Sequence, residues 1–88
     1  MRIHKFELPW MPAITEVMMP VGAEIHFISG RHEYPVIWAV VDVDAPKRAR
    51  KFLTIKTDIE MPDLPLKALG TAILDAGAYV LHVFEVLQ

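Results

Sequence analysis

An unbroken apolar run near the middle of the chain constrains the fold more than any other feature of the sequence. Every residue in positions 36–41 is apolar, most are β-branched, and the run includes Trp38. Turn-forming residues bound it, with Gly30 before it and Asp44 and Pro46 after it. A short apolar run between turn signals predicts a strand that is buried on both faces. We therefore expect the Trp38 ring to lie in the core.

Short strands separated by Gly, Pro and Asp turns account for the rest of the chain. Expected strands are residues 2–8 at a sheet edge, 14–19, 23–29, 34–43, 49–57 and, inside a sheet, 78–87. Residues 65–70 fit either one helical turn or the start of a strand that runs to Leu74. The chain is therefore predicted to be mainly β, a compact antiparallel sandwich or small barrel of about six to seven strands, with at most one short helical turn near residues 64–70. Its 88 residues are expected to form a single β domain, 1–88.

Two local patterns give finer expectations. In the 49–57 strand, Leu53 and Ile55 alternate with Thr54 and Lys56, which predicts one apolar face and one solvated face. Residues 75–77, Asp-Ala-Gly, are typical of a hairpin turn, because glycine adopts positive φ without strain.

The apolar content exceeds what so small a chain can hide. Hydrophobic residues make up 53% of the sequence, and the mean hydropathy is +0.32. A domain of this size buries only roughly 60–65% of the surface that its unfolded chain exposes. Obligate homodimer interfaces resemble a core cut in half, so the surplus predicts a homo-oligomer.

Charge and residue usage exclude several classes of partner and location. The net charge is −2, so the chain lacks the excess positive charge with which proteins bind duplex nucleic acid. No stretch approaches the roughly 20 apolar residues of a membrane span, so no membrane partner is expected. The absence of cysteines excludes disulfides and thiol catalysis. Together with a start that does not resemble a signal peptide, it predicts a cytoplasmic protein.

The sequence offers no catalytic or metal-binding constellation. The four histidines lie on separate expected strands or in a turn, without the paired spacing of a zinc site, and His82 is expected to be a hydrogen-bonded interior residue. Asp42 and Asp44 would share a strand face and could bind a hard cation or exchange protons, but turn formation is the favoured explanation. Ser29 is the only serine and has no marked acid or oxyanion partner. We therefore predict no catalytic residues, no metal and no cofactor, and a protein that is not an enzyme.

Five residues are candidates for ligand binding. The densest positive charge lies at positions 47–51, where Arg side chains could hold phosphate oxygens or form a solvated turn. An aromatic side chain stands in the Pro-Trp-Met-Pro loop, either as a contact surface or folded back as a lid. A further arginine precedes the central strand, at its opposite end. A nucleotide pocket between subunits would use Trp10, Arg31, Lys47, Arg48 and Arg50.

Five short motifs in order along nearly the whole chain carry a resemblance to a known family. They are residues 2–6, 19–25, 38–42 with 44–46, 69–71 and 81–85. In these the chain resembles a family of small bacteriophage and prophage proteins, a domain of unknown function. It departs from the family's pattern at the Asp-Ala-Gly turn of residues 75–77 and at the proline-tryptophan insertion of residues 9–12. The resemblance implies a small protein acting inside a bacterial host, and it supplies no catalytic residues.

These observations favour a small non-catalytic phage-type binding protein. We expect it to self-associate and to interfere with a host system by binding a host protein or a small nucleotide signal. An alternative is a structural or assembly accessory protein of a phage. A small hydrolase is the least favoured function, because no Ser/His/Asp site is visible.

Overall fold

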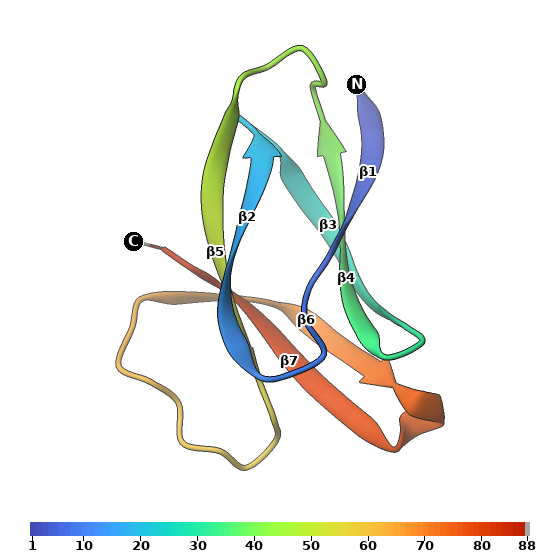
Figure 1. The fold of residues 1–88 in the computed structure, drawn as a ribbon. Coiled ribbons are helices and arrows are strands. Elements are labelled where there is room, and N and C mark those ends of the chain that lie inside the picture. The colour runs from blue at the N-terminus through green and yellow to red at the C-terminus, as the bar shows by residue number, and fades with distance from the viewer. Residues whose placement is uncertain (88) are drawn as a thin grey trace.

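Seven antiparallel strands form two sheets in the computed structural model, which describes residues 1–87 (Figure 1). The three-stranded sheet has the order β1-β4-β3, and the four-stranded sheet has the order β2-β5-β7-β6. The mainly β fold predicted from the sequence is therefore confirmed. The elements are β1 (Arg2–Glu7), β2 (Ala13–Pro20), β3 (Glu24–Arg31), β4 (Tyr34–Val41), β5 (Lys47–Ile55), β6 (Leu66–Leu74), the 3₁₀ turn η1 (Asp75–Gly77) and β7 (Tyr79–Val86).

The strand positions follow the turn signals of the sequence. β1 lies at a sheet edge, and β4 and β7 occupy interior positions, as their charge and apolar patterns predict. Residues 65–70 contain no helical turn, because β6 begins at Leu66 and runs to Leu74. The short helical turn lies instead at Asp75–Gly77, between β6 and β7.

The hydrophobic core lies between the two sheets. Every second residue of β4, namely Ile37, Ala39 and Val41, is fully buried against it. From the other sheet, Phe52 and Leu81 are fully buried in the same cluster. Alternation along each strand thus fills one core from two facing surfaces, as in other sandwiches.

The two sheets meet most closely where the edge strands β3 and β6 pass each other. A Cβ atom on Gly30 would overlap the carbonyl oxygen of Ile73 and lie 2.7 Å from Cδ2 of Leu74. Just beyond this point the backbone N–H of Asp75 donates to the carbonyl of His32, with an N···O distance of 3.3 Å. Glycine is therefore required at this crossing, because the two backbones lie too close together to leave room for a Cβ atom.

Trp38 does not lie in the core. It alternates with the core residues of β4 and so lies on the outer face of the three-stranded sheet, half-buried. Its indole Nε1–H donates to Ser29 Oγ at 2.8 Å. The apolar run is continuous, but only one of its two faces is covered by the other sheet. The prediction of a core position was wrong for this reason.

The inward face of β5 also differs from the expectation. Phe52 and Thr54 point toward the core side, so Leu53 and Ile55 lie on the outer face of the four-stranded sheet. Thr54 is only 2% exposed, and its buried hydroxyl is satisfied because it accepts the N–H of Ala13 at 3.1 Å. Leu53 and Ile55 are nevertheless buried, and Lys56 is exposed, as the alternation predicts. Thr54 is the exception, because hydrogen bonding allows a polar side chain to be buried.

Among residues 1–87 no helix has the length and apolar character needed to cross a membrane.

Candidate functional site

The basic residues proposed for ligand binding lie at different ends of the sandwich (Figure 1). Lys47 and Arg48 begin β5 beside the end of β2, so they belong to a strand and not to the preceding turn. Arg31 ends β3 at the β3–β4 hairpin. Trp10 lies in the loop between β1 and β2, half exposed at 50%, and does not fold back as a buried lid. Within one chain Lys47 and Arg48 therefore lie away from Trp10.

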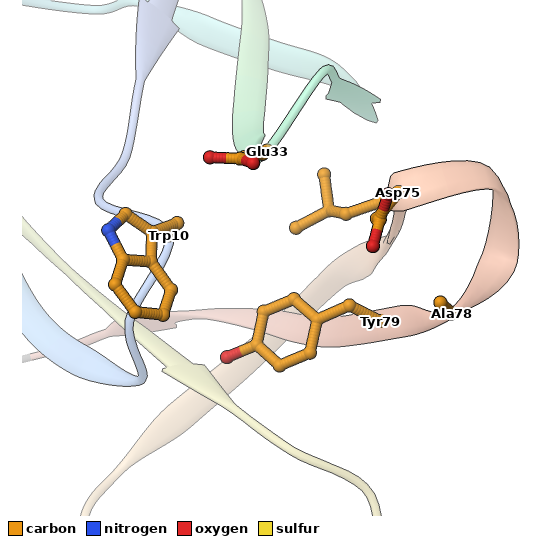
Figure 2. Close-up of a pocket in the computed structure, with 6 residues that line it drawn as sticks. Trp10, Glu33, Asp75, Ala78 and Tyr79 are labelled. Carbon is orange, nitrogen blue, oxygen red and sulfur yellow. The ribbon is translucent and has the colours of Figure 1, made fainter.

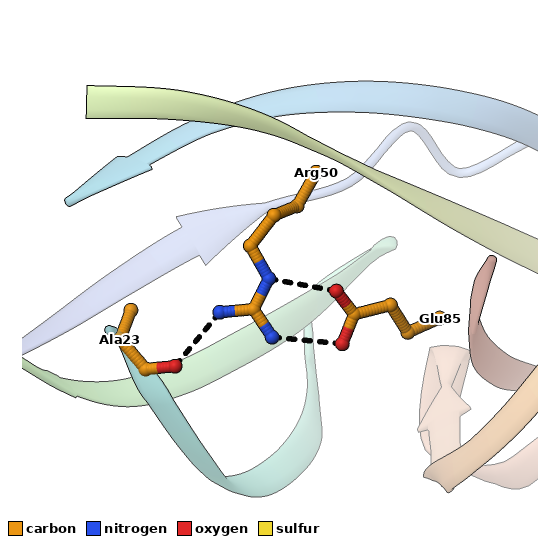
Figure 3. A network of polar contacts seen from close by, with 3 residues as sticks. All are labelled: Ala23, Arg50 and Glu85. Atoms are coloured by element: carbon orange, nitrogen blue, oxygen red, sulfur yellow. Dashed lines mark hydrogen bonds and ion pairs between the residues drawn. The ribbon is translucent and has the colours of Figure 1, made fainter. Parts of the chain in front are cut away.

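Arg50 is engaged inside the protein (Figure 3). Its Nε and one terminal nitrogen donate to the two carboxylate oxygens of Glu85, each at 2.7 Å, and its other terminal nitrogen donates to the carbonyl of Ala23 at 2.7 Å. The hydrogen bonds that Arg50 donates to Glu85 raise the pKa of Arg50, against the opposing effect of burial. This fork ties β5 and β7 to the start of β3, across the two sheets.

A hollow at the turn end of the sandwich gathers aromatic and acidic side chains (Figure 2). It has a volume of about 370 Å³ and is lined by Trp10, Glu33, Leu74, Asp75, Ala78 and Tyr79. We call it the aromatic hollow. The two rings come from separate elements, the loop before β2 and the start of β7, and the carboxylates come from the β3–β4 hairpin and from η1. Of the five predicted ligand-binding residues, Trp10 is in its lining.

The backbone beside the aromatic hollow adopts uncommon conformations. His32 has φ 55°, Asp75 has φ 49° and Ala76 has φ 52°, all in the left-handed region although none is glycine. Such residues cost roughly 1–2 kcal/mol each and concentrate at functional sites. A second hollow of about 420 Å³ adjoins this backbone and shares Glu33 and Asp75 with the aromatic hollow. The two hollows therefore lie next to each other, with Glu33 and Asp75 between them.

One row of side chains on the outer face of the four-stranded sheet is apolar across all four strands. Register places Ile14, Leu53, Phe84 and Ala68 side by side in one row. The next row combines a charged pair with two apolar residues: Glu16, Lys51, Val86 and Leu66. No strand of this chain packs over this face among residues 1–87. Leu64 of the β5–β6 loop lies beside Ile14, Lys51 and Val86, and Leu53 is only 7% exposed. We call this surface the outer apolar face.

The polar groups elsewhere have structural roles. The imidazole of His82 lies between two threonine hydroxyls, with Nε2 2.8 Å from Thr57 Oγ1 and Nδ1 3.1 Å from Thr71 Oγ1. The expectation of a hydrogen-bonded His82 is confirmed, although the ring is half-buried on an outer face. Asp42 Oδ1 accepts the N–H of Asp44 at 3.0 Å, as in the predicted turn. In the described part of the chain no group of three His, Asp or Glu side chains is placed to hold a metal ion.

Sequence reasoning did not find Glu33, Asp75 or Tyr79 as site residues. Glu33 and Asp75 belong to turns, where acidic residues are common, and Tyr79 belongs to a strand rich in apolar residues. The available signal was two turns with non-glycine positive φ, which only the backbone reveals. The two turns lie side by side because β3 packs beside β6, and these two strands are far apart in the sequence.

Comparison with curated proteins and with solved structures gives no match. A scan against protein families matches one family, described as a domain of unknown function, over residues 1–88. The match covers all seven strands of the sandwich. The chain belongs to the family of the domain of unknown function DUF7352.

Proposed function

We propose that this protein is a non-catalytic binding protein that acts as a homo-oligomer, with copies packed through the outer apolar face. Following the resemblance noted above, it works in the cytoplasm of a bacterial host, as a phage-type protein that interferes with a host system by binding a host protein. What supports the self-association is the row of Ile14, Leu53, Phe84 and Ala68, which crosses four strands without a charge. Ile14 and Ala68 are exposed in it, Phe84 is half-buried, and Leu53 is already buried within the chain.

The size of the outer apolar face supports a partner of the same shape. Four strands spaced about 4.8 Å apart and about eight residues long cover on the order of 500 Å² in projection. Two such faces packed together would bury about 1,000 Å² or more, near the lower bound of specific interfaces. The adjacent Glu16 and Lys51 cancel in charge, so a second copy meets no net repulsion there.

The oligomeric state tests this proposal with a matched pair of variants. Ile14→Lys places a charge on the outer apolar face at a residue 53% exposed, and Ile3→Lys places the same charge on the other sheet's outer face at a residue 62% exposed. Sedimentation of the native protein should give a multiple of the 10.0 kDa chain. Ile14→Lys should be a monomer and Ile3→Lys should not.

Either of two results contradicts the proposal. A monomeric native protein at micromolar concentration removes the self-association altogether. Dissociation by Ile3→Lys with retention by Ile14→Lys moves the interface to the three-stranded sheet. A virion accessory role, the alternative function, predicts the protein in purified particles, and mass spectrometry of virions decides between the two.

A further inference from the structure

The aromatic hollow combines the two kinds of group that recognise an organic cation. The face of an aromatic ring attracts a cation within about 6 Å of its centroid, and a carboxylate adds direct attraction. Trp10 and Tyr79 supply the rings, and Glu33 and Asp75 supply the carboxylates. The lining contains no basic side chain, so no residue of the lining neutralises these two acids.

One of the two rings already carries a cation from the protein itself. Lys56 Nζ lies over the Tyr79 ring, 5.0 Å from its centroid. Lys56 is not in the lining of the hollow, so an incoming cation would have to stack on Trp10 or displace Lys56 from the Tyr79 ring. Tyr79 also packs against the core, so its ring is held in place and presents a preorganised surface to the hollow.

A backbone hydrogen bond joins the two turns that carry the acids. Glu33 directly follows His32, and the carbonyl of His32 accepts the N–H of Asp75 at 3.3 Å. The left-handed conformations of His32 and Asp75 shape the two turns that carry these carboxylates. Strain of this kind persists where the surrounding structure enforces it, and it is a pointer to a binding site.

The dimensions suit a side chain of a protein better than a free small molecule. The aromatic hollow, at about 370 Å³, is near the lower end of ligand pockets and is open. The second hollow lies next to it and shares Glu33 and Asp75 in its lining, so an occupant that passes these two residues has a second concave surface to contact. A segment of polypeptide with one cationic side chain in the aromatic hollow matches this shape.

We propose that the aromatic hollow binds an arginine side chain from an exposed segment of a partner protein. Guanidinium is planar, stacks on aromatic rings and presents a fork of donors to carboxylates, which ammonium does not. The two carboxylates disfavour phosphate-bearing ligands at the same place. This proposal rests on the partner-binding half of the proposed function and is independent of the self-association half.

Trp10 fluorescence provides the test. The chain has two tryptophans, and Trp38 lies on an outer sheet face, so Trp38→Phe leaves Trp10 as the only reporter. This variant is titrated with a nine-residue Gly/Ser peptide that carries one central arginine, and with the same peptide carrying citrulline, a neutral isostere. Calorimetry on the unmodified protein repeats the titration without the substitution.

The expected result is a saturable change in Trp10 emission with the arginine peptide and at least about tenfold weaker binding of the citrulline peptide. Binding should weaken as salt is raised. The double variant Glu33→Gln/Asp75→Asn should weaken arginine binding by about tenfold or more at an unchanged Tm. A control with the same change in net charge, Glu60→Gln/Asp63→Asn in the β5–β6 loop, should bind as the unmodified protein does.

Three results overturn the proposal. The first is equal binding of the arginine and citrulline peptides, and the second is no saturable signal by either method up to millimolar peptide. The third is an equal loss of binding in the Glu60/Asp63 control, which would make the effect one of overall charge. Each titration is also run on Ile14→Lys, the variant designed to be monomeric. An absence of peptide binding at the aromatic hollow is thereby distinguished from an absence of self-association.

Discussion

Replacing Arg50 tests how the two sheets are held together. Arg50→Met removes three hydrogen bonds of 2.7 Å and leaves Glu85, whose side chain is 13% exposed, without its cation. Breaking one partner of a buried ion pair costs about 3–5 kcal/mol. Because Arg50 and Glu85 retain 18% and 13% exposure, some of the lost interaction is replaced by water, and we expect about 2–4 kcal/mol.

A double-mutant cycle separates the pair from its surroundings. Arg50→Met/Glu85→Leu removes both charges, so no unpaired carboxylate remains, and we expect a total loss of only about 1–2 kcal/mol, chiefly from the unsatisfied Ala23 carbonyl. The double variant should then be more stable than Arg50→Met alone. Urea unfolding at one fixed protein concentration measures each free energy, because self-association makes stability depend on concentration.

The cycle also has a defined pH behaviour. The pKa of Arg50 is raised above its ordinary value by its hydrogen bonds to Glu85. A raised pKa contributes stability that is fully present below the ordinary value and is lost only as pH rises through the folded one. The contribution of Arg50 should therefore stay constant between pH 6 and 9. A loss under about 0.5 kcal/mol for Arg50→Met, or additive single effects, would refute the described geometry.

Three further substitutions test particular contacts by chemical unfolding. Gly30→Ala should destabilise the fold by about 1–3 kcal/mol, because the new Cβ atom overlaps the Ile73 carbonyl. In an open strand the same substitution stabilises by about 0.4–1 kcal/mol. A gain in stability would therefore disprove the close approach of β3 and β6. Thr54→Val should cost about 1–3 kcal/mol by leaving the Ala13 N–H unpaired, and an unchanged midpoint would contradict that bond. Trp38→Phe should cost only about 0.5–1.5 kcal/mol, the value of its bond to Ser29, and a loss above 3 kcal/mol would restore a core position.

The local patterns of the sequence were sufficient to predict the strands, because side chains alternate between the two faces of a strand and burial therefore follows a two-residue period. β4 was predicted from its unbroken apolar run, and β7 from its two apolar faces. The same patterns do not state which face meets the other sheet. For that reason Trp38 was assigned to the core and Thr54 to the solvated face of its strand, although Leu53 and Ile55 are buried and Lys56 is exposed as expected.

The site depends on contacts between residues that are distant in the chain, which a single sequence does not encode in readable form. Trp10 was named as a candidate because an aromatic side chain stands between two prolines. Its neighbours Glu33 and Tyr79 lie 23 and 69 positions away (33 − 10 and 79 − 10). Arg50 was named because of its basic neighbours, and its engagement by Glu85 depends on the β5–β7 register.

The separation of the two proposed surfaces has a functional consequence. Leu74 and Tyr79 belong to the core side of the four-stranded sheet, so the aromatic hollow opens at the end of the sandwich and not on the outer apolar face. Packing of two copies through that face therefore leaves both hollows free. A partner with two arginine-bearing segments would then bind its second segment intramolecularly, at an effective concentration of about millimolar for a short linker. Ile14→Lys should consequently weaken binding of a tandem arginine peptide while leaving the single-arginine peptide unaffected, and equal effects on both would contradict this coupling.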